Sequence, residues 1–516
     1  MITFLKRPPY FSLGLPSTWV QRFTAMHPVV ILILGLALAQ AIAAFQVHRS
    51  NLDLLNTLTA VSSAGYLAIP GKHVMGSLSD FGPAFWGGFF FTFSIGAGVT
   101  LGAMAAGWLW IRLFRHQKTG LFFWGFVWAA LLFMINSNGF TLMPTLYFVI
   151  IAPVIFALTA LWDPSPFRTK NRFKDWIHLA PLPLLALLWF TQFDGAMFLD
   201  LRDNLLLSND YGRKFSNFYY TYTLYPAQAF KALSQKTIKT ADIENVPSRS
   251  LKHLIGRQLL ANDYLPLSDD ARVDLVVRQN NDQLVFQADG RRVFQTPTRQ
   301  FLDDAPGVLR RFSEACDRHA IFRQFTFLSL LIGFPIALYM IAHAALYYPG
   351  YFIMGRRTSA LTASISCLLI GCLVLIYFQS NRSRSIDSRN IANSLSSEYW
   401  QTRIAALKLI TKKKLDIADY KSYPVLKDNR PSQERYWLVG ALAYSRRPEN
   451  MAVVLEYLKD ADLNVRTMAL YSLGRLGNPR AVQPILSIVL NSQSWYEQMY
   501  AYKAIRSLGW KQTKSH

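Results

Sequence analysis

Residues 462–479 read Asp-Leu-Asn-Val-Arg-Thr-Met-Ala-Leu-Tyr-Ser-Leu-Gly-Arg-Leu-Gly-Asn-Pro, and this stretch decides the fold of the C-terminal region. Its apolar side chains recur at the spacing of one helix face: Val465, Met468, Ala469, Leu473 and Leu476. Gly477 can end that helix in a left-handed conformation, and Pro479 can begin the next one. The stretch therefore predicts one helix, a tight turn and the start of a second helix.

The same pattern returns along the tail with a period of 32 residues. Two sets of positions fall in register: Ala405, Trp437, Ala469 and Ala501, and Leu409, Ala441, Leu473 and Ile505. A single hairpin cannot bury its apolar face alone, but four stacked hairpins can share a continuous core. We therefore predict an internally repeated helical domain over residues 379–516.

The quoted stretch resembles the HEAT-like repeats of the PBS-lyase type, whose pattern is D-x-x-V-R-x-x-A-x-x-A-L-G-x-x-G-D/N-x-x-A. The matching residues are Asp462, Val465, Arg466, Ala469, Leu473, Gly474, Gly477 and Ala481. The resemblance covers about a quarter of the chain and implies a short α-solenoid that binds other proteins through a concave face. The alternative is that the repeats merely cap the membrane domain that the rest of the chain predicts. No lyase activity is carried over.

Composition indicates a membrane protein with soluble parts. Of the 516 residues, 52% are hydrophobic and only 16% are charged, and the mean hydropathy is +0.17, whereas a soluble domain carries about 25% charged residues. Seven apolar stretches predict membrane spans: residues 28–47, 84–114, 121–135, 142–162, 177–193, 325–348 and 361–378. The second is rich in glycine, which predicts close helix packing. The membrane part is assigned to no known family.

Lysine and arginine in the short loops predict the orientation. The N-terminal tail and the loops after the second, fourth and sixth predicted spans together hold twelve lysines and arginines. The short loops on the opposite side hold two, Arg49 and Lys72. The N-terminus is therefore expected in the cytoplasm and the C-terminus outside, which in a Gram-negative cell means an inner-membrane protein with periplasmic domains. The first span is interpreted as an uncleaved signal-anchor, although Ala41-Ile42-Ala43 resembles a signal-peptidase site.

We thus expect a mainly α fold: a helix bundle of about seven spans, a small α+β insertion and a C-terminal solenoid. The domains are residues 1–193 (spans one to five), 194–322 (insertion), 323–378 (spans six and seven) and 379–516 (repeats). The repeat domain has 22 basic and 11 acidic residues, and the insertion has 17 and 16. A basic repeat surface can attract anionic headgroups or an acidic protein. Nucleic acid is not expected on that side of a membrane.

The insertion has three predicted parts. Residues 217–225 are rich in aromatic side chains, typical of an interfacial helix or strand, or of a groove for a lipid or isoprenoid chain. Residues 238–260 indicate a linker and a polar helix. Alternating apolar residues between 273 and 293, with turns at Asn281 and Gly290, predict a three-strand meander. A helix over residues 308–319 can run on into the sixth span.

Four acidic residues at the predicted outer membrane edge are the candidates for chemistry: Asp53, Asp194, Asp200 and Asp203. Carboxylates at that depth can bind a divalent metal or act as a general base on a lipid-linked substrate. The simpler interpretation is that they are exposed charges at helix ends. The topology, without any diagnostic motif, is similar to that of the GT-C glycosyltransferases, which use polyprenyl-phosphate sugars.

No motif for a cofactor or a metal stands out, so none is predicted. Cys316 stands alone in a polar segment, and Cys367 and Cys372 are interpreted as small packing residues. No predicted span carries Asp or Glu inside it, which counts against an ion-coupled transporter, and His343 is interpreted as a packing residue.

Three functions remain open. The first is a non-enzymatic scaffold whose repeats recruit another envelope protein, in contact with membrane lipids. The second is a membrane enzyme acting at the outer leaflet on a lipid-linked substrate. The third is a lipid or solute transporter. We expect the scaffold, and the sequence identifies neither partner nor substrate.

Overall fold

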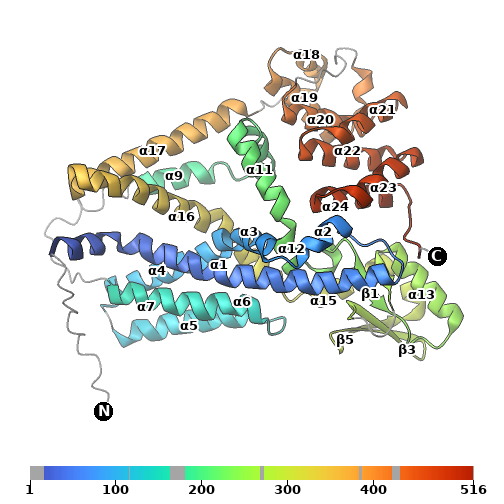
Figure 1. The fold of residues 1–516 in the computed structure, drawn as a ribbon, viewed down its shortest axis with the longest axis horizontal. Coiled ribbons are helices and arrows are strands. Elements are labelled where there is room, and N and C mark those ends of the chain that lie inside the picture. Colours follow the sequence, from blue (N-terminus) through green and yellow to red (C-terminus); the bar gives the residue numbers. More distant parts are fainter. Residues whose placement is uncertain are drawn as a thin grey trace. The chain divides into compact units, whose positions relative to one another are not determined.

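The computed structural model describes residues 17–115, 117–162, 181–267, 272–382, 386–420 and 430–514. The chain is mainly helical, with one small sheet (Figure 1). It divides into two compact units. The first comprises Met1–Ile42, Phe91–Pro181 and Ile321–Cys367, and the second comprises Ala43–Phe90, Leu182–Ala320 and Leu368–His516. The four-domain division predicted above follows membrane topology and stays a prediction.

Six helices in the described residues are long and apolar enough to cross a membrane. They are Pro28–Ser63, Phe81–Arg112, Lys118–Ile135, Leu142–Ala160, Ala320–Met354 and Arg356–Asn381. They coincide with six of the seven predicted spans. In the remaining one, residues 177–193, the described part contains the shorter apolar helix α9 (Pro181–Phe190). The basic residues between 163 and 180, and those of the first 16 residues, lie outside the described chain.

The first unit is built from long apolar helices. Its elements are α1 (Ser17–Ser63) as far as Ile42, the π-helical turn η2 (Thr92–Gly96), α4 (Ala97–Arg112), α5 (Lys118–Ile135), α6 (Leu142–Leu146), η3 (Tyr147–Ile151), α7 (Ala152–Trp162), α16 (Ala320–Met354) and α17 (Arg356–Asn381) as far as Cys367. A β-carbon at Gly96 would collide with Ala39 of α1, and one at Gly98 would collide with Ser329 of α16. The expected close packing around the glycine-rich helix is therefore confirmed.

The second unit contains a five-stranded sheet with the order β2-β1-β3-β4-β5. The strands are β1 (Lys239–Asp242), β2 (Tyr264–Pro266), β3 (Leu275–Asn280), β4 (Gln283–Ala288) and β5 (Arg291–Pro297). The antiparallel strands β3, β4 and β5 confirm the predicted meander. The parallel strands β1 and β2 were not predicted, because they are short and β1 is buried throughout, so neither alternates along its length.

Helices α13 (Arg249–Ala261), α14 (Thr298–Asp303) and α15 (Ala305–Ala315) accompany the sheet. Phe301 of α14 and Phe312 of α15 pack on Phe286 of β4 in a core of buried apolar side chains. Helix α15 ends at Ala315 and α16 begins at Ala320, so the helix predicted here does not run on into the sixth apolar stretch.

The C-terminal region forms paired helices, named here the repeat array. They are α18 (Ile391–Leu395), α19 (Trp400–Lys413), α20 (Ser432–Leu442), α21 (Glu449–Glu456), α22 (Leu463–Leu476), α23 (Val482–Asn491) and α24 (Trp495–Ser507). The predicted register agrees with the core: seven of the eight positions are buried or half-buried in one cluster, with Ala469 and Ala501 fully buried, and Ala405 is buried outside that cluster. Gly477 follows α22 with φ of 73°, the expected left-handed end.

Between α9 and the sheet, the chain forms α10 (Met197–Leu201), the π-helical turn η5 (Arg202–Leu206), α11 (Asp210–Tyr222) and α12 (Leu224–Ala229). The stretch that sequence left open between helix and strand is therefore helical. Two further helices of this unit are α2 (Lys72–Met75) and α3 (Phe81–Phe91).

Candidate functional site

Three of the four candidate carboxylates share basic partners, one of which, Lys408, belongs to the repeat array. Asp200 lies in α10, and Asp203 lies in the π-helical turn that follows it. Both residues are buried, with exposed fractions of 8% and 1%, so the interpretation as exposed helix-end charges was wrong for them. A buried carboxylate has lost its hydration and requires partners inside the protein.

Asp203 is bound by three side chains. Its Oδ1 accepts hydrogen bonds from Nε and Nη2 of Arg202, at 2.9 and 2.7 Å. Its Oδ2 accepts a hydrogen bond of 2.7 Å from the indole Nε1 of Trp437, and the Lys408 ammonium lies 3.4 Å away. Trp437 and Lys408 belong to the repeat array, so this carboxylate joins the η5 turn to α19 and α20.

Asp200 and Asp194 share a second cation. Nε of Arg382 lies 3.1 Å from Oδ2 of Asp200, and Nη2 of the same arginine donates a hydrogen bond of 2.7 Å to Oδ2 of Asp194. The other oxygen of Asp200 accepts from Lys408 at 3.1 Å. These three carboxylates and the cations Arg202, Arg382 and Lys408 are called the ion-pair network below.

Aromatic rings lie beside two cations of this network, the buried Arg202 and the half-buried Lys408. The Arg202 guanidinium lies 4.0 Å from the ring centre of Tyr436, and the Lys408 ammonium lies 5.2 Å from that of Trp437. Such contacts attract a cation through the ring quadrupole. Burial opposes the charged form of Arg202, but the Asp203 carboxylate together with Tyr436 and Tyr220 outweighs it, so the pKa of Arg202 is raised. Burial also raises the pKa of Tyr220 beside it to about 12.

The network balances three negative charges with three positive ones. All six carboxylate oxygens face a donor or a cation, because Oδ1 of Asp194 accepts the backbone N–H of Ala196. An arrangement of this kind holds two segments together. It leaves no carboxylate oxygen of the three unoccupied for a substrate proton or a metal ion.

Asp53 lies elsewhere in the structure. It is on α1, which runs on to Ser63, and its side chain is exposed. Within the described part of the chain, Asp53 forms no ion pair, and its backbone carbonyl accepts a hydrogen bond from Thr57. The structure therefore does not join Asp53 to the ion-pair network.

Sequence reasoning missed the partners Arg382, Lys408 and Trp437. One signal was present, since Trp437 occupies a register position where the other three repeats have alanine. A large polar-tipped side chain at a packing position needs a hydrogen-bond acceptor nearby, and Asp203 supplies it.

The repeat array has further attachments inside the second unit. Asp263, beside β2, accepts a hydrogen bond of 2.7 Å from Tyr502 and pairs with Arg506 at 2.8 Å. Gln512 exchanges two hydrogen bonds with the backbone of Leu67, at 3.1 and 2.9 Å. The array is thus fixed to three separate segments of its own unit.

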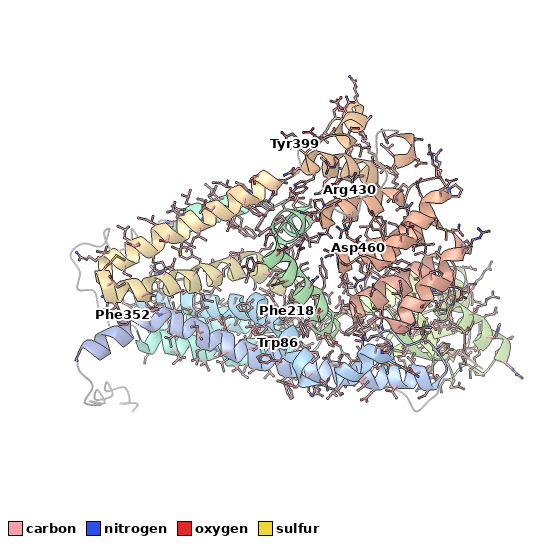
Figure 2. All side chains as sticks on the ribbon, turned by 45° about the horizontal axis from the view of Figure 1, so that its top comes forward. Trp86, Phe218, Phe352, Tyr399, Arg430 and Asp460 are labelled. Carbon is pink, nitrogen blue, oxygen red and sulfur yellow. The ribbon has the colours of Figure 1, made fainter. Side chains whose placement is uncertain are left out.

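A cavity of about 510 Å³ lies between α11 and the helices α19 and α20, and Leu207, which follows the η5 turn, also lines it. Its lining includes Arg213, Trp400, Arg430 and Arg435. Figure 2 labels Arg430 and Asp460 in this part of the repeat array; Arg435 binds Asp460 through two hydrogen bonds of 2.7 and 2.9 Å. The hydrogen bonds to Asp460 outweigh burial and raise the pKa of Arg435.

Comparison with known proteins agrees with the repeat geometry. Residues 421–506 match the family model for HEAT repeats. No curated protein and no solved structure matches the chain. The C-terminal region therefore contains HEAT repeats.

Proposed function

We propose that this protein is an integral membrane scaffold whose HEAT repeats, held by the ion-pair network, bind another protein. The observation that carries the proposal is the way in which the carboxylates of Asp200 and Asp203 are bound. Both carboxylates are buried against Arg382, Lys408 and Trp437, so they serve to attach the repeat array. HEAT repeats commonly bind proteins, and an array fixed at several points presents a rigid surface.

The membrane location rests on the six long apolar helices and on the distribution of basic residues. Twelve lysines and arginines against two favour a cytoplasmic N-terminus, with residues 194–322 and 379–516 on the opposite side. In a Gram-negative cell this corresponds to the inner membrane and the periplasm. Fusions of a topology reporter after Gln379 and near Arg115 test it, and a cytoplasmic signal from the first would refute the orientation.

The proposed partner is an acidic segment of another envelope protein. The repeat domain has 22 basic residues against 11 acidic ones, and its surface includes Tyr399, which is 72% exposed. The arginines that line the cavity beside Trp400 are already paired with carboxylates of this chain, so the exposed Lys412 and Arg480 are the basic side chains proposed to meet the partner. Such a contact weakens as salt rises, because screening shortens the range of surface charges.

The experiment combines co-purification with complementation of a deletion strain. The full chain in mild detergent is compared with a charge-reversal variant of exposed repeat residues (Lys412→Glu, Lys413→Glu and Arg480→Glu) and with Asp200→Asn, at matched expression. A scaffold requires that charge reversal removes a co-purifying protein and function together. Full function of the charge-reversal variant, with a correctly folded but inactive Asp200→Asn protein, would refute the scaffold.

One observation favours the enzyme as a second candidate. Asp53 is exposed and forms no ion pair among the described residues, so its carboxylate is free to act on a substrate. An enzyme acting on a lipid-linked substrate, similar in topology to GT-C glycosyltransferases, loses nearly all activity in Asp53→Asn, because an amide is not a general base. Complementation by Asp53→Asn at wild-type level would eliminate this candidate.

A further inference from the structure

Helix α11 carries its small residues inward and several of its aromatic residues outward. A β-carbon at Gly212 would collide with the backbone of Leu206, and Ser216 is buried. On the other side of the helix, Tyr211 is 86% exposed and Phe215 is 57% exposed. The surface helix of a soluble protein shows the reverse distribution, with the apolar stripe facing the core. The outward face of α11 therefore needs an apolar cover.

The aromatic face continues onto α3. The rings of Trp86 and Phe218 meet edge to face with centres 5.9 Å apart, and Figure 2 labels both. Trp86 and Phe81 on α3 are themselves exposed. The exposed residues Phe81, Trp86, Tyr211, Phe215 and Phe218 are called the aromatic patch. Helix α3 is the first part of the long apolar helix Phe81–Arg112, so the patch is continuous with a candidate membrane span.

A basic side chain accompanies the patch. Lys214 lies three residues after Tyr211 and four before Phe218, which places it on the same side of α11. It is exposed, and no ion pair involves it in the described chain. Its neighbour Arg213 pairs with Asp210, so Lys214 is the cation of this helix that remains for a negative group outside the protein.

We propose that α11 lies on the surface of the bilayer, with the aromatic patch among the lipid acyl chains and Lys214 at an anionic headgroup. Aromatic side chains with a flanking lysine are typical of the interface between membrane and water. A bilayer covers the exposed side chains of α3 and α11 together, because α3 continues into a span. This inference rests on the membrane location proposed above and adds the site at which lipid is bound outside the spans.

The test places one fluorophore at a time on the full chain reconstituted in phosphatidylcholine vesicles. The native Cys316, Cys367 and Cys372 are replaced by alanine, and the environment-sensitive dye is attached at Phe215→Cys, Asn217→Cys or Leu369→Cys. Asn217 is exposed on α11 but lines the cavity beside the repeats, so it is the matched control. Leu369, 58% exposed on α17, reports whether the chain is embedded at all. Quenching by nitroxide-labelled lipid is then measured.

We expect strong quenching at positions 215 and 369 and several-fold weaker quenching at 217. Quenching at 369 but not at 215 would overturn this inference and leave the membrane location standing. No quenching at 369 would overturn the membrane location itself. Dye-to-dye energy transfer between copies at 215, without lipid quenching, would show that a second copy covers the patch and would also overturn the inference.

A second measurement keeps the native cysteines. Phe215→Asp places a charge among the acyl chains and should lower the Tm of the reconstituted protein, whereas Asn217→Asp should leave it unchanged. Adding phosphatidylglycerol should raise the Tm of the wild type more than that of Lys214→Glu. Equal behaviour of the two aspartate variants, or of the two proteins toward phosphatidylglycerol, would contradict the proposal.

Discussion

The indole N–H of Trp437 donates a hydrogen bond of 2.7 Å to the buried carboxylate of Asp203, 234 residues earlier in the chain. In the register of the repeats, this tryptophan stands where Ala405, Ala469 and Ala501 stand in the other units. One repeat has therefore exchanged a small packing residue for a donor that reaches outside the array. The position can be used for attachment because it is only half-buried by the neighbouring helices.

Replacing Trp437 with phenylalanine removes this donor and keeps an aromatic ring. We expect the free energy of unfolding to fall by about 1–3 kcal/mol, since Oδ2 of Asp203 is left with Lys408 alone. Thermal unfolding of the full chain in detergent measures the change. Tyr399→Phe, which removes an exposed hydroxyl group, is the control and should change stability by less than about 0.5 kcal/mol. Equal effects would mean that the hydrogen bond to Asp203 contributes nothing.

Lys408 lies between two buried carboxylates, 3.1 Å from Asp200 and 3.4 Å from Asp203. Lys408→Met should destabilise the protein by about 3–5 kcal/mol, because it leaves buried negative charges without their partner. The exposed Lys412→Met on the same helix should cost less than about 0.5 kcal/mol. The double variant Asp200→Asn/Lys408→Met should lose less than the sum of the two single variants. Strict additivity would show that the two groups do not interact.

Ala469 is fully buried in the core of the repeat array, and Arg480 is exposed. Ala469→Asp should destabilise the array by several kcal/mol, because the added carboxylate has no partner there. Arg480→Glu should change stability by less than about 0.5 kcal/mol. Hydrogen exchange of the backbone amides of α22 and α24 in the full chain distinguishes the two variants. An equal loss of protection in both would refute the 32-residue register of the repeats.

Lys231 gives a prediction for pH. Burial, reinforced by Lys503 and Lys236, lowers the pKa of Lys231 from 10.5 to about 8. The unfolded chain therefore binds this proton more tightly, and stability should rise as the pH increases from about 8 to about 10.5. Lys231→Met should be more stable than the wild type at pH 7 and should lose that advantage above this window. Chemical denaturation across the range measures it, with the exposed Lys412→Met as the control. A constant difference between Lys231→Met and the wild type would contradict the assignment.

Patterns that repeat along the chain were predictable from sequence, because each is decided by neighbouring residues. The period of 32 located the repeats, and long apolar runs located the six long helices. Alternation and the turns at Asn281 and Gly290, both with positive φ, located the meander. Such signals survive folding, since tertiary contacts rarely override a long amphipathic pattern.

The composition of the ion-pair network was not predictable in the same way. The carboxylates could be identified, but their burial depends on Arg382 and Lys408, which approach only in the folded unit. The sequence did not predict the strands β1 and β2 for a related reason. They have four and three residues, and β1 pairs with β2 and β3 across at least 20 residues of intervening chain, so no local pattern marks them.

The hydrogen bonds between Leu67 and Gln512 connect residues 445 positions apart. They have a consequence for biosynthesis. The second unit can reach its full set of contacts only after residue 512 has been synthesised, because the backbone of Leu67 pairs with the side chain of Gln512. A ribosome that stops before residue 512 would release a chain with the amide and carbonyl of Leu67 unsatisfied. Folding of this unit therefore cannot be completed while only its early segment has emerged from the ribosome.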